Sequence, residues 1–148
     1  MAYVKAVPDG YHSLQPYLIF KSCVAAIAFY TEAFGATQRL CMKNENGTVG
    51  HAEIEVGDSC LMMADENEKM EAFAPEHYGG SPINLMFYTE ACDAVYARAV
   101  AAGATSVREP ADQPYGDRIC GIKDPFGYTW WIATHIKNMT KEELERNG

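Results

Sequence analysis

The sequence predicts an α+β fold in which two tandem β-α-β-β-β modules form a curved mixed sheet. Two repeated features support this prediction. The ends of two expected helices carry the same tripeptide, Gly35-Ala36-Thr37 and Gly103-Ala104-Thr105, and a glycine turn leads into an apolar strand within both 56–64 and 124–135. These features recur after about seventy residues, a period that indicates an internal duplication.

The duplication divides the chain into four parts of a single expected domain. The stretch between the repeats is acidic and contains the helix and strand breakers Pro75, Gly79, Gly80 and Pro82, so we expect a linker or flap there. The expected parts are module one at 15–64, the linker or flap at 65–82, module two at 83–135, and a C-terminal tail at 136–148.

The composition excludes several classes of protein. The chain has 148 residues, of which 48% are apolar and 22% charged, as is usual for a globular domain. Its net charge is −8 and no Lys or Arg cluster is present, so no nucleic-acid partner is expected. No apolar run approaches the ~20 residues of a membrane span, and the start of the chain lacks the apolar core of a signal peptide. We therefore expect a cytoplasmic protein with no membrane partner.

Module one is expected to begin with a strand at 15–20, after an extended arm at 1–14. Ser22 is positioned to cap a helix and Gly35 to end it, because serine accepts hydrogen bonds from first-turn amides and glycine adopts the left-handed conformation. Helical spacing predicts a buried face made of Val24, Ile27, Ala28 and Phe34.

Three further strands complete module one, at 37–43, 49–56 and 59–63. Asn46-Gly47 predicts a hairpin turn between the first two of them. Strict alternation in the second places His51, Glu53 and Glu55 on one face of the sheet.

Module two is predicted to repeat this order. Pro110 and Pro114 predict a loop at 109–115, and Thr140 with Glu143 forms a capping box that predicts a short helix in the tail. Five cysteines without a C-x-x-C pair are expected to be free thiols. The strands and the helix of module two are expected at 83–88, 90–102, 105–108, 118–123 and 128–133.

The motifs of the two modules resemble those of the vicinal oxygen chelate superfamily, which includes glyoxalase I, extradiol dioxygenases, and bleomycin and fosfomycin resistance proteins. The resemblance is carried by PYL, AFGA, HAE, LMMAD, YGDR and DPFGY, in that order. Within the superfamily, the chain is most similar to a glyoxalase-like subgroup named after a protein of the phosphonate operon. The resemblance spans residues 15–135 and implies the glyoxalase/bleomycin resistance fold.

Metal-binding members of that superfamily place two ligands on each module, in its first and last strands. Counting from the helix ends and turns assigns these positions to Gln15, Met62, Asn84 and Trp131. Tryptophan has no lone pair to donate, methionine suits soft metals only, and amides are weak ligands. No cofactor is therefore expected, although the resemblance leaves a divalent metal as an alternative.

The same strand positions are expected to form a concave face. Gln15, Tyr17, Met62, Asn84, Met86 and Trp131 lie on this face, and their mixture of aromatic, thioether and amide groups is typical of a small-molecule pocket. The alternative is a residual core between the modules. Tyr115 and Arg118 precede and enter a strand beside the pocket, where Arg118 binds either an anionic ligand group or, in an ion pair, Asp117 or Glu53.

These observations lead to three hypotheses. The first is a homodimer that binds a small organic molecule without the family metal. The second is a metal-dependent or acid–base lyase, isomerase or dioxygenase, in which His51 and Glu53 exchange protons with the substrate. The alternative for these two side chains is simple solvation. The third is a scaffold without a small ligand.

Overall fold

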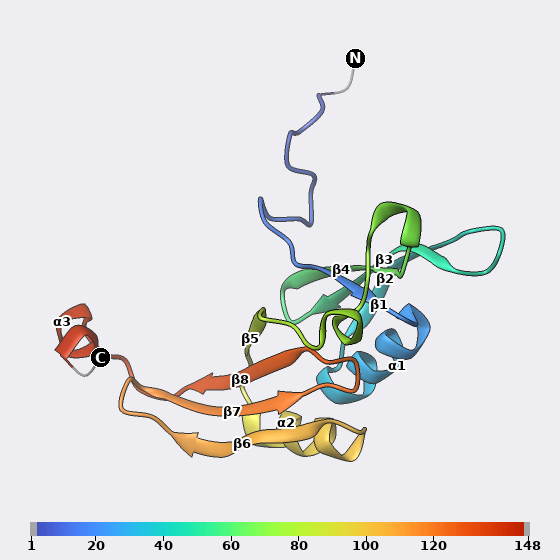
Figure 1. Cartoon of the computed structure of the whole chain (residues 1–148). Coiled ribbons are helices and arrows are strands. Elements are labelled where there is room, and N and C mark those ends of the chain that lie inside the picture. Colours follow the sequence, from blue (N-terminus) through green and yellow to red (C-terminus); the bar gives the residue numbers. More distant parts are fainter. Residues whose placement is uncertain (1–2, 147–148) are drawn as a thin grey trace.

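The computed structural model describes residues 3–146 and contains two four-stranded mixed sheets. The predicted α+β fold of two tandem β-α-β-β-β modules is confirmed, with one sheet in each module. Figure 1 shows module one in the upper half of the view and module two in the lower half. Helices α1 and α2 pack against each other and join the two modules. No helix within the described range is long and apolar enough to cross a membrane.

Module one has the strand order β1-β4-β3-β2, in which β1 and β4 are parallel and the other neighbours antiparallel. The predicted hairpin turn is present, with Gly47 at φ 86° and its amide bonded to the carbonyl of Asn44 at 3.0 Å. The elements of module one are β1 (Tyr17–Phe20), α1 (Cys23–Phe34), β2 (Thr37–Lys43), β3 (Val49–Val56) and β4 (Ser59–Asp65).

Both predicted ends of helix α1 are confirmed, but its predicted buried face is only partly right: Phe34 is buried and Ile27 packs against the core, whereas Val24 and Ala28 are exposed. Ser22 Oγ accepts a hydrogen bond from the Ala25 amide at 3.2 Å, and Gly35 ends the helix with φ 68°. Val24 is 57% exposed. Because nearly every residue of α1 is apolar, the sequence does not mark one face, and tertiary packing selects it. The buried residues are Cys23, Ala26, Phe29, Tyr30, Ala33 and Phe34.

Module two repeats the topology, with the strand order β5-β8-β7-β6. Strand β6 continues through Pro110, so the loop predicted at 109–115 is wrong for its first four residues. Proline has no backbone N–H to donate. It is tolerated here because β6 is the outer strand of its sheet and has no neighbouring strand on its open side to bind such a donor. The elements of module two are β5 (Asn84–Tyr88), α2 (Cys92–Ala101), β6 (Thr105–Asp112), β7 (Asp117–Lys123) and β8 (Thr129–His135).

The segment between the modules contains two short 3₁₀ helices, η1 (Glu68–Met70) and η2 (Pro75–Tyr78). Lys21 Nζ forms an ion pair with Glu76 Oε2 at 2.6 Å, which ties η2 to the start of α1. In the tail, α3 (Lys141–Arg146) begins after Thr140, whose Oγ1 accepts a hydrogen bond from the Glu143 amide at 3.1 Å. Residues 1–2 of the predicted arm and 147–148 of the predicted tail lie outside the described range.

The start of β8 joins the cores of the two modules. Asp124, in the turn before β8, is 4% exposed, and Tyr30 of α1 donates its hydroxyl hydrogen to this carboxylate. Trp130 Nε1 donates to Asp124 Oδ2 at 3.0 Å, and its ring lies 4.7 Å from that of Phe34. Tyr128 donates to the Ile19 carbonyl at 2.8 Å. Aromatic side chains of module two therefore complete the core of module one.

Candidate functional site

Each sheet has one face covered by a helix and one face turned away from it. In module one, Tyr17 and Glu53 both lie opposite Met62 in the register of β1, β3 and β4. In module two, Met86 lies opposite Trp131. Residues directly opposite each other in a sheet share a face. The predicted concave face is thus present in each module, and His51 and Glu53 lie on the face of module one that includes Tyr17.

A hydrogen-bonded cluster occupies the concave face of module one. Glu53 is 4% exposed, and its two oxygens accept from different residues. Tyr11 Oη donates to Oε1 at 2.5 Å, and His51 Nε2 lies 2.8 Å from Oε2. The other ring nitrogen of His51, Nδ1, lies 2.8 Å from Tyr17 Oη. The cluster therefore runs from a buried carboxylate, through an imidazole, to a tyrosine hydroxyl.

The N-terminal arm encloses the carboxylate end of this cluster. The guanidinium of Arg39 lies 4.5 Å from the centre of the Tyr11 ring and donates to the Gly10 carbonyl at 3.0 Å. Burial raises the pKa of Glu53, but hydrogen bonds from Tyr11 and His51 outweigh it, so the pKa lies below its ordinary value. Glu53 is consequently a carboxylate at neutral pH and can only accept hydrogen bonds.

Module two holds a second cluster of the same residue types at the end of its sheet. Asp117, 5% exposed, accepts from Tyr88 Oη at 2.7 Å and lies 2.8 Å from His135 Nδ1. His135 Nε2 lies 2.9 Å from the side-chain oxygen of Asn138. The hydrogen bond to Asp117 raises the pKa of His135 above its ordinary value. This cluster holds the start of the C-terminal tail against β7.

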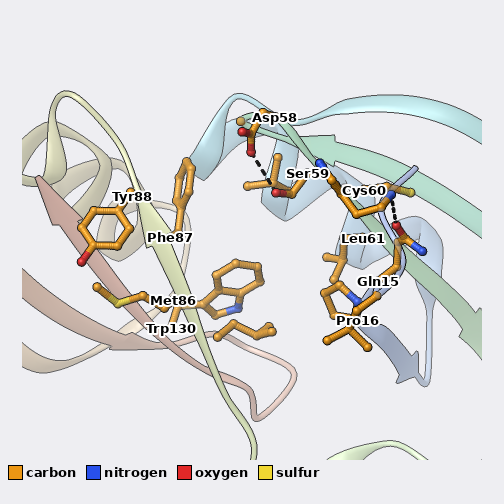
Figure 2. Close-up of a pocket in the computed structure, with 15 residues that line it drawn as sticks. Gln15, Pro16, Asp58, Ser59, Cys60, Leu61, Met86, Phe87, Tyr88 and Trp130 are labelled. Atoms are coloured by element: carbon orange, nitrogen blue, oxygen red, sulfur yellow. Dashed lines mark hydrogen bonds between the residues drawn. The ribbon is translucent and has the colours of Figure 1, made fainter. Parts of the chain in front are cut away.

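A groove of about 490 Å³ separates the two modules. Figure 2 shows Met86, Phe87 and Tyr88 on one side of it, with Gln15, Pro16 and the start of β4 on the other. Trp130 lies at its base in the same view. Apolar and aromatic walls with a few polar groups are the usual lining of a small-molecule site.

The groove brings together only some of the predicted ligand residues. Gln15 and Met86 line it. Tyr17 instead borders two other cavities, of about 370 and about 480 Å³. Met62, Asn84 and Trp131 lie on the concave faces and do not line the groove, and Tyr115 is 40% exposed in the turn before β7. The ligand-binding roles of all these residues stay predictions.

Arg118 does not lie on the concave face. It stands opposite Thr134 in the register of β7 and β8, and its Nε and Nη2 bind Asp93 of α2 at 2.7 and 2.9 Å. Its Nη1 binds Asp112 at 3.0 Å. The predicted ion pair with Asp117 or Glu53 is therefore wrong in its partners, because the alternation of β7 turns this side chain toward the helix.

The four positions that hold metal in the resembling enzymes do not form a suitable donor set here. Gln15 Oε1 accepts from the His12 amide at 2.5 Å. The indole of Trp131 lies across Gly121, where an added Cβ would meet its ring at 2.6 Å. Within residues 3–146, no group of three or more His, Cys, Asp or Glu side chains is placed to hold a metal ion. The residues present do not fit the divalent ion of those enzymes.

Sequence reasoning missed the contributions of the arm and of the turn between β3 and β4. Tyr11 closes the Glu53 cluster across 42 residues, and no local pattern signals such a contact. His12 and Leu14 line the groove together with the turn residues Gly57 and Asp58. Leu14 is 85% exposed, but the arm also contains the apolar residues Val4 and Val7, so its sequence does not single Leu14 out.

Known proteins are similar to this chain in sequence and in fold. A family model described as "Glyoxalase/Bleomycin resistance protein/Dioxygenase superfamily" matches residues 14–132. The uncharacterized protein Mb0911c of Mycobacterium bovis is 29% identical over 136 residues, which cover 90% of each chain. The uncharacterized protein At5g48480 of Arabidopsis thaliana is 28% identical over 128 residues, covering 81% of this chain and 76% of that one.

Two solved structures extend the comparison. The X-ray structure of the Arabidopsis protein aligns with a TM-score of 0.65 and 25% identity, over 83% of this chain and 98% of that one. A structure described as a putative 3-demethylubiquinone-9 3-methyltransferase, PhnB protein, from Bacillus cereus aligns with a TM-score of 0.64 over 83% and 99%. Its identity is 19%, so this second likeness concerns the fold alone.

Proposed function

Because the chain belongs to the glyoxalase/bleomycin resistance protein/dioxygenase superfamily, we propose that it binds a small organic molecule in the groove between its modules. The lining of the groove is the observation that carries this proposal. Met86, Phe87 and Trp130 supply apolar surface, and Gln15 supplies a hydrogen-bonding amide. A volume of about 490 Å³ suits a molecule of one or two rings.

The proposal is tested by the thermal stability of the protein with neutral aromatic compounds. A ligand that binds only the native state raises the melting temperature, and Met86→Ala is expected to reduce that rise. Val24→Ala, which removes an exposed side chain on the outer face of α1, is the matched control and leaves the rise unchanged. The absence of stabilisation by any compound would favour the scaffold hypothesis.

We also propose that binding occurs without the family metal. The support is chemical: the four positions carry two amides, a thioether and an indole, and the indole already packs on Gly121. Elemental analysis of the purified protein is the test. One tightly bound divalent ion per chain would contradict this part of the proposal and leave ligand binding intact.

Two finer assignments accompany this proposal. The likeness to the PhnB protein supports membership of the phosphonate-operon subgroup. Exposed apolar side chains on both concave faces support a homodimer that covers them, among them Tyr17 at 47%, Met86 at 48% and Tyr88 at 56%. Light scattering coupled to size-exclusion chromatography measures the mass directly, and a monomeric mass would contradict the dimer.

The cluster on module one favours a second candidate function, an acid–base lyase or isomerase. A histidine held between a carboxylate and a tyrosine hydroxyl is the arrangement needed to move a proton. A solvated pair of side chains would not require Glu53 to be 4% exposed. The test is loss of turnover on His51→Ala and Glu53→Gln once a converted compound is found.

A further inference from the structure

Tyr17 stands at the exposed end of the cluster on module one. Side-chain exposure rises from 5% at Glu53 to 26% at His51, and Tyr17 is 47% exposed. A ligand that approaches this face therefore meets the tyrosine before it meets the imidazole or the carboxylate.

The hydrogen bonds of the cluster leave one group free to act on a ligand. Glu53 Oε1 is engaged by Tyr11 Oη and Oε2 by His51 Nε2, which must carry a hydrogen because a carboxylate only accepts. His51 Nδ1 is engaged by Tyr17. Neither ring nitrogen can reach a ligand without breaking one of these bonds. Tyr17 Oη retains unused hydrogen-bonding capacity.

We propose that Tyr17, with His51 and Glu53 behind it, is the catalytic residue that exchanges a proton with an oxygen of the ligand. This inference rests on the acid–base function proposed above and names its contact residue. The forward step begins with hydrogens on both ring nitrogens of His51, so that Nε2 donates to Glu53 and Nδ1 donates to Tyr17 Oη, which leaves the Tyr17 hydrogen free for the ligand. The Tyr17 O–H bond breaks as the ligand oxygen gains the proton, and the His51 Nδ1–H bond breaks as the phenolate takes that proton. Solvent returns a proton to His51, and no electrons are transferred.

The surroundings of Tyr17 suit a proton donor. Burial raises the pKa of Tyr17, and the negative charge of Glu53 acts in the same direction. The phenol therefore stays protonated at neutral pH. An ionised Glu53 stabilises positive charge on His51, much as the buried carboxylate of a catalytic triad does.

The cavities beside Tyr17 indicate the class of ligand. The smaller one, of about 370 Å³, is lined by Pro16, Phe73, Tyr78 and Ile83 among others. Rings and proline side chains favour a flat apolar body. Together with a proton donor, they point to a neutral carbonyl compound whose oxygen accepts from Tyr17. Protonating that carbonyl oxygen makes the hydrogens on the adjacent carbon more acidic, and solvent water takes one of them as the enol forms.

The test follows proton exchange in 2-tetralone, a bicyclic ketone, in deuterated buffer by NMR. The wild-type protein is expected to accelerate loss of the hydrogens beside the carbonyl, and Tyr17→Phe to lose about 100-fold of that acceleration. His51→Gln removes the imidazole that returns a proton to Tyr17, and its exchange rate is expected to fall by a similar factor. Tyr96→Phe removes a hydroxyl that donates to Ser106 Oγ at 2.6 Å, away from the cluster, and should retain the full rate.

A parallel melting measurement with 2-tetralone and with tetralin, which lacks the oxygen, separates binding from proton exchange. Stabilisation of the wild type by 2-tetralone without acceleration would overturn the relay and leave ligand binding standing. Loss of rate in His51→Ala but not in Tyr17→Phe would overturn the role of Tyr17 and leave acid–base function standing. Absence of both stabilisation and acceleration would overturn the relay and count against binding of this class.

Discussion

Module one and module two each bury a carboxylate beside a tyrosine and a histidine, but they connect the three groups in a different order. In module one the order is Tyr17, His51, Glu53, so the imidazole stands between the hydroxyl and the acid. In module two, Tyr88 and His135 both bind Asp117, so the acid stands in the middle. Only the first order can pass a proton along the chain of groups.

The sheets also differ at the rung where module one holds its carboxylate. Glu53 lies opposite Met62, and the corresponding residue of module two, opposite Trp131, is Gly121. The missing side chain at Gly121 makes room for the indole. The duplicated topology thus preserves the backbone positions, while the side chains at those positions differ between the modules.

The largest expected effect concerns the residue that joins the modules. Asp124→Ala would leave the buried Tyr30 hydroxyl and the Trp130 N–H without their partner, so we expect the free energy of unfolding to fall by about 3–5 kcal/mol. Urea unfolding measures it, with the exposed Glu32→Ala as the control. A loss below about 1 kcal/mol would mean that the two modules are stable separately.

A smaller effect is expected at the glycine that distinguishes module two. An added methyl group at Gly121 would lie 2.6 Å from the Trp131 ring, so Gly121→Ala must displace the indole. We expect a cost of about 1–3 kcal/mol and a change in tryptophan fluorescence. Ala133→Gly on the neighbouring strand gives a comparison for small-residue changes on this sheet. Unchanged fluorescence would contradict the packing of Trp131 on Gly121.

The two carboxylates should stabilise different ends of the chain. Asp117→Asn weakens the attachment of the tail, and Glu53→Gln that of the arm, each by about 1–2 kcal/mol, because each amide loses the charge of a charge-assisted hydrogen bond. Hydrogen exchange by mass spectrometry should show faster exchange at 134–138 in the first variant and at 8–12 in the second. Faster exchange at both ends in either variant would contradict this separation.

The smallest effects are opposite responses to pH. The pKa of Glu53 is lowered, so its stabilisation is present above its ordinary value of 4.5 and is lost as pH falls through the folded value. The pKa of His135 is raised, so its stabilisation is present below 6.5 and is lost as pH rises through the folded value.

Amide exchange at Tyr11 and Ile136, corrected for intrinsic rates, reports these responses separately. The Ile136 amide is bonded to the Gly116 carbonyl at 2.9 Å, and that of Tyr11 to the Pro8 carbonyl at 3.2 Å. Lowering the pH should reduce the protection of the Tyr11 amide against exchange, and raising the pH mildly should reduce that of the Ile136 amide. A change of the same sign at both would refute the assignment.

The order of strands and helices could be predicted from the sequence because its signals are local. Ser22, Gly35 and Gly47 each fix a cap or a turn through their own conformation and hydrogen bonds. The buried face of α1 and the length of β6 could not be predicted, since packing and edge position determine them.

The site was predictable only as far as strand alternation extends. Alternation correctly placed His51 and Glu53 on one face. It gave no information about Tyr11, which lies in a distant arm. The face on which Arg118 lies was predicted wrongly, because successive residues of a strand point to opposite faces and a shift of one residue reverses the assignment. The part of the site that could not be predicted therefore depends on contacts between remote segments rather than on residue types.

The residues that the turn before β8 contributes to the core of module one have a consequence for folding. The bond between Tyr30 and Asp124 spans 94 residues, and that between Ile19 and Tyr128 spans 109. Such distant contacts slow folding because long loops must close before the contacts form. During synthesis, the core of the first module therefore stays incomplete, with apolar surface exposed, until the segment that leads into the last strand has been made.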